Sequence, residues 1–245
     1  MISPESLVVA DAHWAADFGC ARAELRPAAP RVQRHAGSLL GYAGVQIFVA
    51  GAAPLVSVPS ALFDAVAGRA EQLTLTALCD AKSLVPLLAP GNVTRVIGPA
   101  LLHYADRSCF APVPAPSTRA LTTADAAAFA DLAAACQAED WEPKEFAVDS
   151  GVAHGSFSAE GTLMACAGYR IWAERIAHVS VVTRPSARSQ GYGTRAVAHA
   201  VGQALAVGLL AQYRVLEHNT ASRRIAAKLG FQPYGFTVAA RLAQA

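Results

Sequence analysis

The segment Arg188–Gly193, of sequence RSQGYG, most constrains what this chain can fold into. The β-branched run Ile176–Thr183 before it predicts a strand, and the Ala- and Val-rich stretch after it has helical spacing. A loop between a strand end and a helix start gathers main-chain N–H groups, and the helix N-terminus adds positive potential. Glycine in such a loop allows a ligand to approach the backbone closely. The sequence therefore predicts a phosphate or pyrophosphate site here.

The same loop also matches the dinucleotide pattern G-x-G-x-x-A through Gly191, Gly193 and Ala196, with Glu217 as a candidate ribose acid. That interpretation requires the first glycine close to the end of the strand. Here residues 183–190, which include Pro185, intervene, and too little chain follows for the remaining strands of a nucleotide domain. The dinucleotide interpretation is therefore disfavoured.

A second motif follows the loop at 219–231, with Asn219 and Ser222 at its start and the sequence KLGF at its end. Taken together, R-x-x-G-x-G at 188–193 and this second motif closely resemble the signature of the GNAT superfamily of N-acetyltransferases. The resemblance covers roughly 117–245 and implies an α/β fold with a mixed, mainly antiparallel sheet and splayed central parallel strands. The two motifs, in this order and at this separation, support the resemblance more strongly than either motif alone.

The resemblance implies acetyl-CoA as the acyl donor, with its pantetheine arm between strands Ile176–Thr183 and Tyr213–Glu217. It places the pyrophosphate on the main chain of the loop and makes the Val182 N–H a candidate oxyanion donor. The residues it assigns to the cofactor are Val181, Val182, Thr183, Arg188, Ser189, Gln190, Gly191, Tyr192, Gly193, Thr194, Asn219 and Ser222. No metal is expected.

Acyl transfer to an amine requires a base, and His178 is the first candidate. It shares one face of its strand with Ser180 and Val182 by the period-two rule, although a structural histidine fits the pattern equally well. Glu217 is the second catalytic candidate, with His218 beside it. Many family members carry a tyrosine acid at the position of Ala226, so this chain lacks that proton donor.

Composition excludes several other classes. The chain is 53% hydrophobic and 16% charged with a formal net charge of +2, which predicts neither a nucleic-acid partner nor a disordered protein. Its apolar stretch 196–211 is interrupted by polar residues, and no membrane association is expected. Scattered cysteines without a C-x-x-C pair, and an N-terminus without a signal-like core, predict a cytoplasmic protein with reduced thiols.

The proline-rich segment Ala111–Ser117 predicts a boundary between an N-terminal α/β domain, 1–112, and the GNAT domain, 117–245. In the first part, short strands are expected at 45–50, 55–58 and 93–97, and helices at 60–68, capped by Ser60, and 82–88. The sequence does not indicate the role of this smaller domain, and one alternative is that it is a degenerate copy of the same fold.

In the second part, the pattern predicts strands at 117–121, 152–158, 162–172 and 237–241. Helices are expected from Thr122 or Thr123 to about Cys136, from Tyr192 to about Val207, and from Thr220 to Leu229. An acidic stretch, 139–142, with Trp141 is a candidate wall for the amine pocket, and Trp172 is another.

These observations predict an acyl-CoA-dependent N-acyltransferase that transfers acetyl from acetyl-CoA to an amine by direct attack. The alternative is a catalytically silent acyl-CoA-binding module, in which Ala226 marks the loss of chemistry. The acceptor amine and the oligomeric state, a homodimer included, cannot be predicted from the sequence.

Overall fold

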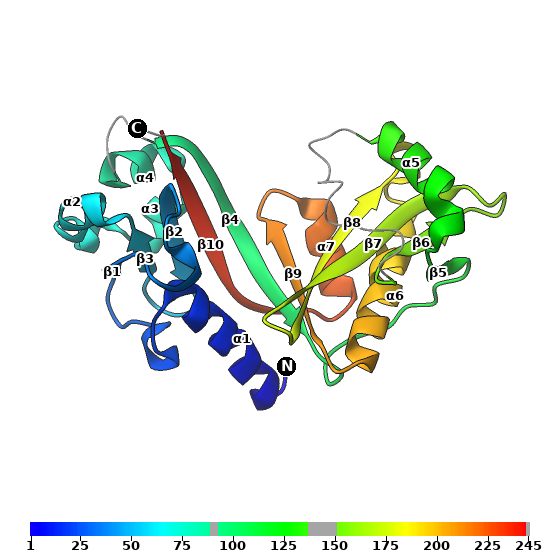
Figure 1. The fold of residues 1–245 in the computed structure, drawn as a ribbon, viewed down its shortest axis with the longest axis horizontal. Coiled ribbons are helices and arrows are strands. Elements are labelled where there is room, and N and C mark those ends of the chain that lie inside the picture. The colour runs from blue at the N-terminus through cyan, green and yellow to red at the C-terminus, as the bar shows by residue number, and fades with distance from the viewer. Residues whose placement is uncertain (89–92, 137–150, 244–245) are drawn as a thin grey trace. The chain divides into compact units, whose positions relative to one another are not determined.

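The computed structural model of the protein describes residues 1–88, 93–136 and 151–243 (Figure 1). The expected acidic wall at 139–142 lies outside the described residues. Within the described ranges, no helix is long and apolar enough to cross a membrane.

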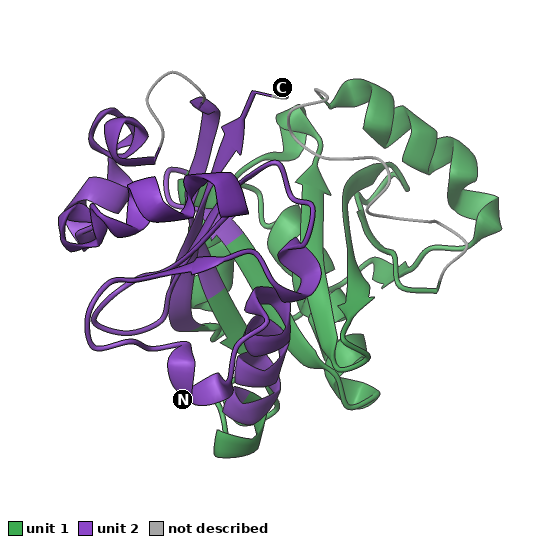
Figure 2. Cartoon of the chain, turned by 60° about the vertical axis from the view of Figure 1, so that its left-hand side comes forward, with its two compact units in different colours: residues 1–6, 103–214, 219–232 green, residues 7–102, 215–218, 233–245 purple. Residues whose placement is uncertain are grey.

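Contacts divide the chain into two compact units, each assembled from non-contiguous segments (Figure 2). Unit 1 comprises 1–6, 103–214 and 219–232, and unit 2 comprises 7–102, 215–218 and 233–245. The units do not divide at the expected boundary, Ala111–Ser117, because that segment lies inside unit 1. That this segment separates two domains stays a prediction.

Unit 2 has the strand order β1-β3-β2-β10-β4. Its strands are β1 (Arg31–Arg34), β2 (Gly44–Val49), β3 (Leu55–Val58), β4 (Val93–Ala105) and β10 (Gln232–Leu242), and its helices are α1 (Pro4–Phe18), α2 (Phe63–Ala67), α3 (Leu75–Cys79) and α4 (Ala81–Leu88). Strands β2 and β10 pair antiparallel, whereas β1 and β3 pair in parallel.

Alternation along β2 divides the core of unit 2 between two faces. Ile47 and its neighbours at even spacing pack against α2, α3 and α4. Phe48 faces the other way and stacks on Trp14 of α1, with ring centroids 5.0 Å apart. Ser60 does not cap a helix as expected: 60–62 form a 3₁₀ turn without a side-chain cap, and α2 begins only at Phe63.

Unit 1 has the strand order β9-β8-β7-β6-β5, and the last residues of β4 adjoin β9. Its strands are β5 (Thr118–Ala120), β6 (His154–Phe157), β7 (Leu163–Trp172), β8 (Ile176–Thr183) and β9 (Leu210–Leu216), and its helices are α5 (Ala126–Ala135), α6 (Tyr192–Ala206) and α7 (Thr220–Lys228). Strands β5 to β8 pair antiparallel in sequence order, whereas β8 and β9 run in parallel. The expectation of a mixed α/β fold is confirmed.

The two faces of β8 are covered by different helices. Val182 packs in a cluster with Leu132 of α5. On the opposite face, α6 approaches so closely that a Cβ built on Gly193 would lie 3.7 Å from a methyl group of Val181. The loop at 188–193 leads into α6, so this loop lies on the same side of β8 as α6.

Candidate functional site

Strands β8 and β9 separate along their length. Their parallel pairing covers only Ile176 with Leu210, Ala177 with Ala211, and His178 with Gln212. Both strands continue beyond these pairs, to Thr183 and Leu216. The edge of β8 from Val179 onward is therefore unpaired on its β9 side, which is the splay that the family resemblance implies.

The register shows which main-chain groups face this open edge. Arg184 N–H donates to Met164 O of the neighbouring strand segment, and Leu210 N–H on the other side donates to Arg175 O. Because successive residues of a strand present their N–H and C=O groups to opposite sides, Val182 faces β7, opposite Cys166. Val181 and Thr183 face the open edge. The amide from this edge that can reach an oxyanion is therefore that of Val181 or Thr183, and not that of Val182.

The loop from Arg188 to Gly193 has the conformation of an anion-binding turn. Ser189 and Gly191 have φ values of 63° and 85°, so left-handed residues alternate with ordinary ones. Gly191 is the N-cap of α6 and offers no side-chain cap. The first helical bond runs from Arg195 N–H to Gly191 O, at 3.0 Å, so the preceding N–H groups of α6 have no partner within the helix.

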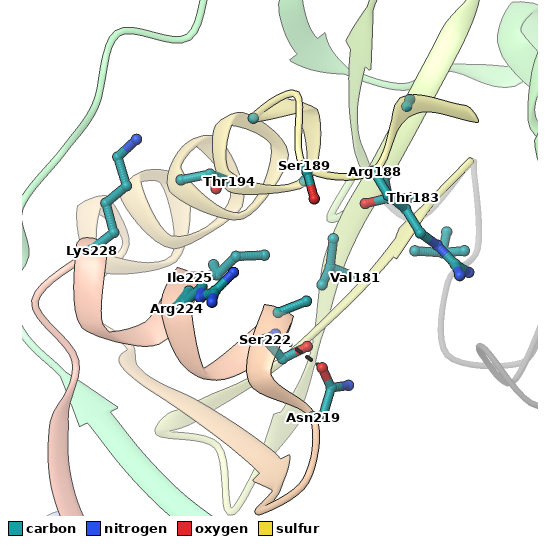
Figure 3. A pocket seen from close by; sticks show the side chains of 15 residues that line it. Val181, Thr183, Arg188, Ser189, Thr194, Asn219, Ser222, Arg224, Ile225 and Lys228 are labelled. Carbon is teal, nitrogen blue, oxygen red and sulfur yellow. Dashed lines mark hydrogen bonds between the residues drawn. The ribbon is translucent and has the colours of Figure 1, made fainter. Parts of the chain in front are cut away.

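A cavity of about 540 Å³ joins the open edge, this loop and helix α7 (Figure 3). Its lining residues are Val181, Val182, Thr183, Ala187, Arg188, Ser189, Gly191, Gly193, Thr194, Asn219, Ala221, Ser222, Arg224, Ile225 and Lys228. The volume is typical of a small-molecule site. All these residues lie in unit 1.

The charges of the cavity suit a polyphosphate. Arg188 lies on the β8 side, and Arg224 and Lys228 project from α7 across from it (Figure 3). No acidic side chain is among the described residues that line it. Guanidinium groups bind phosphate oxygens through paired hydrogen bonds, and an ammonium group adds a compact charge.

Most expected cofactor residues meet in this cavity. Gln190 and Tyr192 do not line it: the Gln190 side chain donates to Ser186 O at 2.8 Å, and the Tyr192 ring packs under the Arg195 guanidinium at 4.3 Å. Asn219 lines the cavity and also caps α7, because its side-chain oxygen accepts from Ser222 N–H at 3.0 Å.

The expected catalytic residues lie outside the cavity. Glu217 follows β9 in unit 2, where its N–H donates to Pro99 O. Burial, and to a smaller extent the charge of Glu217, raises the pKa of the Cys79 thiol. His218 belongs to the same short segment. Neither Glu217 nor His218 is among the residues that line the cavity.

His178 lies on the face of β8 away from α6, within a defined network. Its Nδ1 is 2.8 Å from Gln212 Oε1, and Gln212 Nε2 donates to Tyr104 Oη at 2.6 Å. The Trp172 indole stacks on the imidazole, with centroids 3.9 Å apart and planes 9° apart. Because a carbonyl oxygen only accepts, this arrangement places the proton on Nδ1 and makes Nε2 the basic nitrogen.

Sequence reasoning missed several functional features. Arg224, Ile225 and Lys228 line the cavity. The available signal was helical spacing, because Arg224 and Ile225 follow Ala221 by three and four residues and Lys228 follows them by four and three. Tyr104 and Gln212 carry no local signal, because their contact joins distant segments. The described residues contain no group of three or more His, Cys, Asp or Glu side chains that could hold a metal.

Comparisons with known proteins agree with this geometry. Residues 120–231 match the model of the acetyltransferase (GNAT) family. An acetyltransferase of the GNAT family from Colwellia psychrerythraea is 17% identical with a TM-score of 0.50, and the match covers 64% of this chain and 61% of that one. This chain thus spans less than two thirds of that protein.

A putative acetyltransferase of the GNAT family from Novosphingobium aromaticivorans is 29% identical with a TM-score of 0.48, over 64% of this chain and 69% of that one. A search of curated proteins found no match. Family model, strand splay and phosphate loop agree, so the C-terminal half of this chain, residues 120–231, is a GNAT acetyltransferase domain.

Proposed function

We propose that the protein transfers an acetyl group from acetyl-CoA to an amine. The observation that carries this proposal is one cavity that combines the anion-binding loop at 188–193, the unpaired edge of β8 and three cationic side chains. A molecule with a pyrophosphate at one end and an amide-containing arm at the other matches both halves of this cavity.

The cofactor would lie with its pyrophosphate on the amides of Ser189 to Thr194, beside Arg188. Its pantetheine amides would pair with the main chain of Val181 and Thr183, in the direction that a further strand would take. Holding the thioester in this way supplies orientation, which accounts for much of the rate gain when two reactants are joined at a site. An open-edge amide would stabilise the tetrahedral oxyanion.

His178 would remove the proton from the attacking amine. The Gln212 amide fixes the Nδ1–H tautomer, so that Nε2 can accept a proton, directly or through water. His178 lies on the face of β8 opposite α6, so the amine would approach from the side away from the phosphate loop. Trp172 would then form part of the wall on the amine side.

The experiment measures release of CoA from acetyl-CoA in the presence of a panel of primary amines, with the acetylated product identified by mass spectrometry. The proposal predicts an amine-dependent release and a product heavier by one acetyl group. Tight CoA binding without acetylation of any amine would favour the silent binding module, and absence of CoA binding would refute both.

A further inference from the structure

The hydroxyl group of Tyr213 is buried next to the cavity without a partner. The residue is 3% exposed, and its oxygen makes no hydrogen bond in the part of the chain that the structure describes. Its ring is held in place by Phe231, with centroids 5.6 Å apart. Buried polar groups in folded proteins almost always have a partner, so an unpaired hydroxyl beside a ligand cavity points to a role with the ligand bound.

Tyr213 lies where the two central strands separate. Gln212 is the last residue of β9 that pairs with β8, opposite His178, and Tyr213 follows it. By strand alternation, Tyr213 lies on the opposite face from Gln212 and His178, which is the face of Val181 and Thr183. It therefore stands at the closed end of the gap, on the face that lines the cavity.

Ser222 connects this hydroxyl to the cavity. Its side chain lines the cavity at the first turn of α7. Burial raises the pKa of Tyr213 to about 12, and the Ser222 hydroxyl is close enough to oppose that rise, although not with the geometry of a full hydrogen bond. A serine hydroxyl can accept one hydrogen bond and donate another.

We propose that Tyr213, acting through Ser222, donates a hydrogen bond to the cofactor sulfur and stabilises the charge that develops there as the thiolate leaves. This inference rests on the proposed function. The Tyr213 hydroxyl donates to Ser222 Oγ, and the Ser222 O–H donates to the sulfur. In this arrangement Ser222 touches the cofactor, and Tyr213 is a positioning residue.

The chemical step balances without a net proton from either hydroxyl. The amine nitrogen forms a bond to the acetyl carbon, its proton passes to His178, and the C–S bond breaks with its electron pair on sulfur. A thiol has a pKa near 8.5, far below that of the buried phenol. Tyr213 therefore keeps its proton, and the thiolate takes one from the protonated His178 or from water when CoA leaves. Ala226, a buried residue of α7, offers no alternative donor.

The test measures the thiol pKa of CoA bound to the protein, from the ultraviolet absorbance of its thiolate, so that the acceptor amine need not be known. The wild type is compared with Tyr213→Phe, which removes one oxygen, and with Ser222→Ala. Loss of a hydrogen bond to the charged sulfur destabilises the thiolate. The pKa of the bound thiol should therefore rise by about one to two units in each variant. In Tyr213→Phe, affinity for CoA at pH 6, where the thiol is neutral, should change less than about threefold.

Tyr169→Phe is the matched control, because Tyr169 is also a buried tyrosine, 7% exposed, on β7 outside the cavity. It should leave the bound thiol pKa unchanged. Equal thiol pKa values in wild type, Tyr213→Phe and Ser222→Ala, with CoA bound in each, would overturn this inference and leave the proposed function intact. A wild type that binds no CoA would overturn both.

Discussion

The approach of α6 to β8 at Gly193 offers a quantitative test of the phosphate loop. A Cβ built at this position would lie 2.7 Å from Thr183 Oγ1, but 3.6 Å from Ile225 Cδ1 and 3.7 Å from a Val181 methyl carbon. Only the first contact is too short. Gly193→Ala therefore requires a shift of the start of α6 or of the Thr183 side chain, and we expect either shift to disturb the cavity that both residues line.

Overpacking by one methyl group in a packed site costs about 1–3 kcal/mol. If this cost falls on the ligand-bound conformation, CoA affinity drops by about 5- to 150-fold, at about 1.4 kcal/mol per factor of ten. Isothermal titration calorimetry with CoA measures the affinity, and a thermal melt shows how much of the cost appears as lost stability.

Two further variants test whether the contact between Gly193→Ala and Thr183 Oγ1 causes the loss of CoA affinity. Thr183→Ala removes the clashing oxygen, so the double variant with Gly193→Ala should recover most of the lost affinity. Gly202→Ala is the control on the same helix: a Cβ there meets nothing within 4 Å, so affinity should be unchanged and stability slightly increased. Wild-type affinity in Gly193→Ala, or no recovery in the double variant, would refute the reasoning.

Three further predictions concern pH and the limits of the folded domain. His178→Gln should lower the acetyl transfer rate at saturating acetyl-CoA by at least about tenfold and abolish the rise of rate with pH near neutrality; an unchanged pH profile would rule out His178 as the base. Burial and the charge of His199 lower the pKa of His154 to about 4, below the value of about 6.5 in the unfolded chain. The unfolded chain therefore binds a proton more readily between these values, so the free energy of unfolding should be highest above pH 6.5 and fall as the pH drops towards 4. Thermal melts of wild type and His154→Phe across this range check the effect, and a melting temperature of the wild type that does not vary with pH would contradict it. A fragment of residues 117–245 lacks β4 and hence Tyr104, the hydrogen-bond partner of Gln212, so it should melt at a lower temperature than the full chain; an equal melting temperature would contradict this expectation.

The sequence predicted the strand and the helix on either side of the loop at 188–193 more accurately than the elements farther from it. The strand at Ile176–Thr183 is confirmed to the residue, and α6 begins at the expected Tyr192. Both are specified locally, the strand by β-branched residues and the helix by apolar spacing behind a glycine loop. The expected strand at 93–97 proved to be the first part of a longer strand, β4, whose far end bonds to β9 through Tyr104.

Features that depend on distant contacts could not be predicted. The orientation of the Val182 amide depends on the register between β7 and β8, and a period-two pattern specifies side-chain faces without specifying a neighbour. The tautomer of His178 depends on Gln212, and the buried hydroxyl of Tyr213 depends on the place where pairing between β8 and β9 stops. Helix α1, which stacks Trp14 on Phe48, had only a weakly amphipathic pattern and was not expected.

The most direct test of the account is a crystal structure of the protein with CoA. The proposed function predicts pyrophosphate oxygens within hydrogen-bond distance of the amides between Ser189 and Thr194, with the pantetheine arm against the main chain of Val181 and Thr183 and the sulfur beside Ser222. A structure with CoA bound elsewhere, or with its pantetheine arm outside the gap between β8 and β9, would contradict the account.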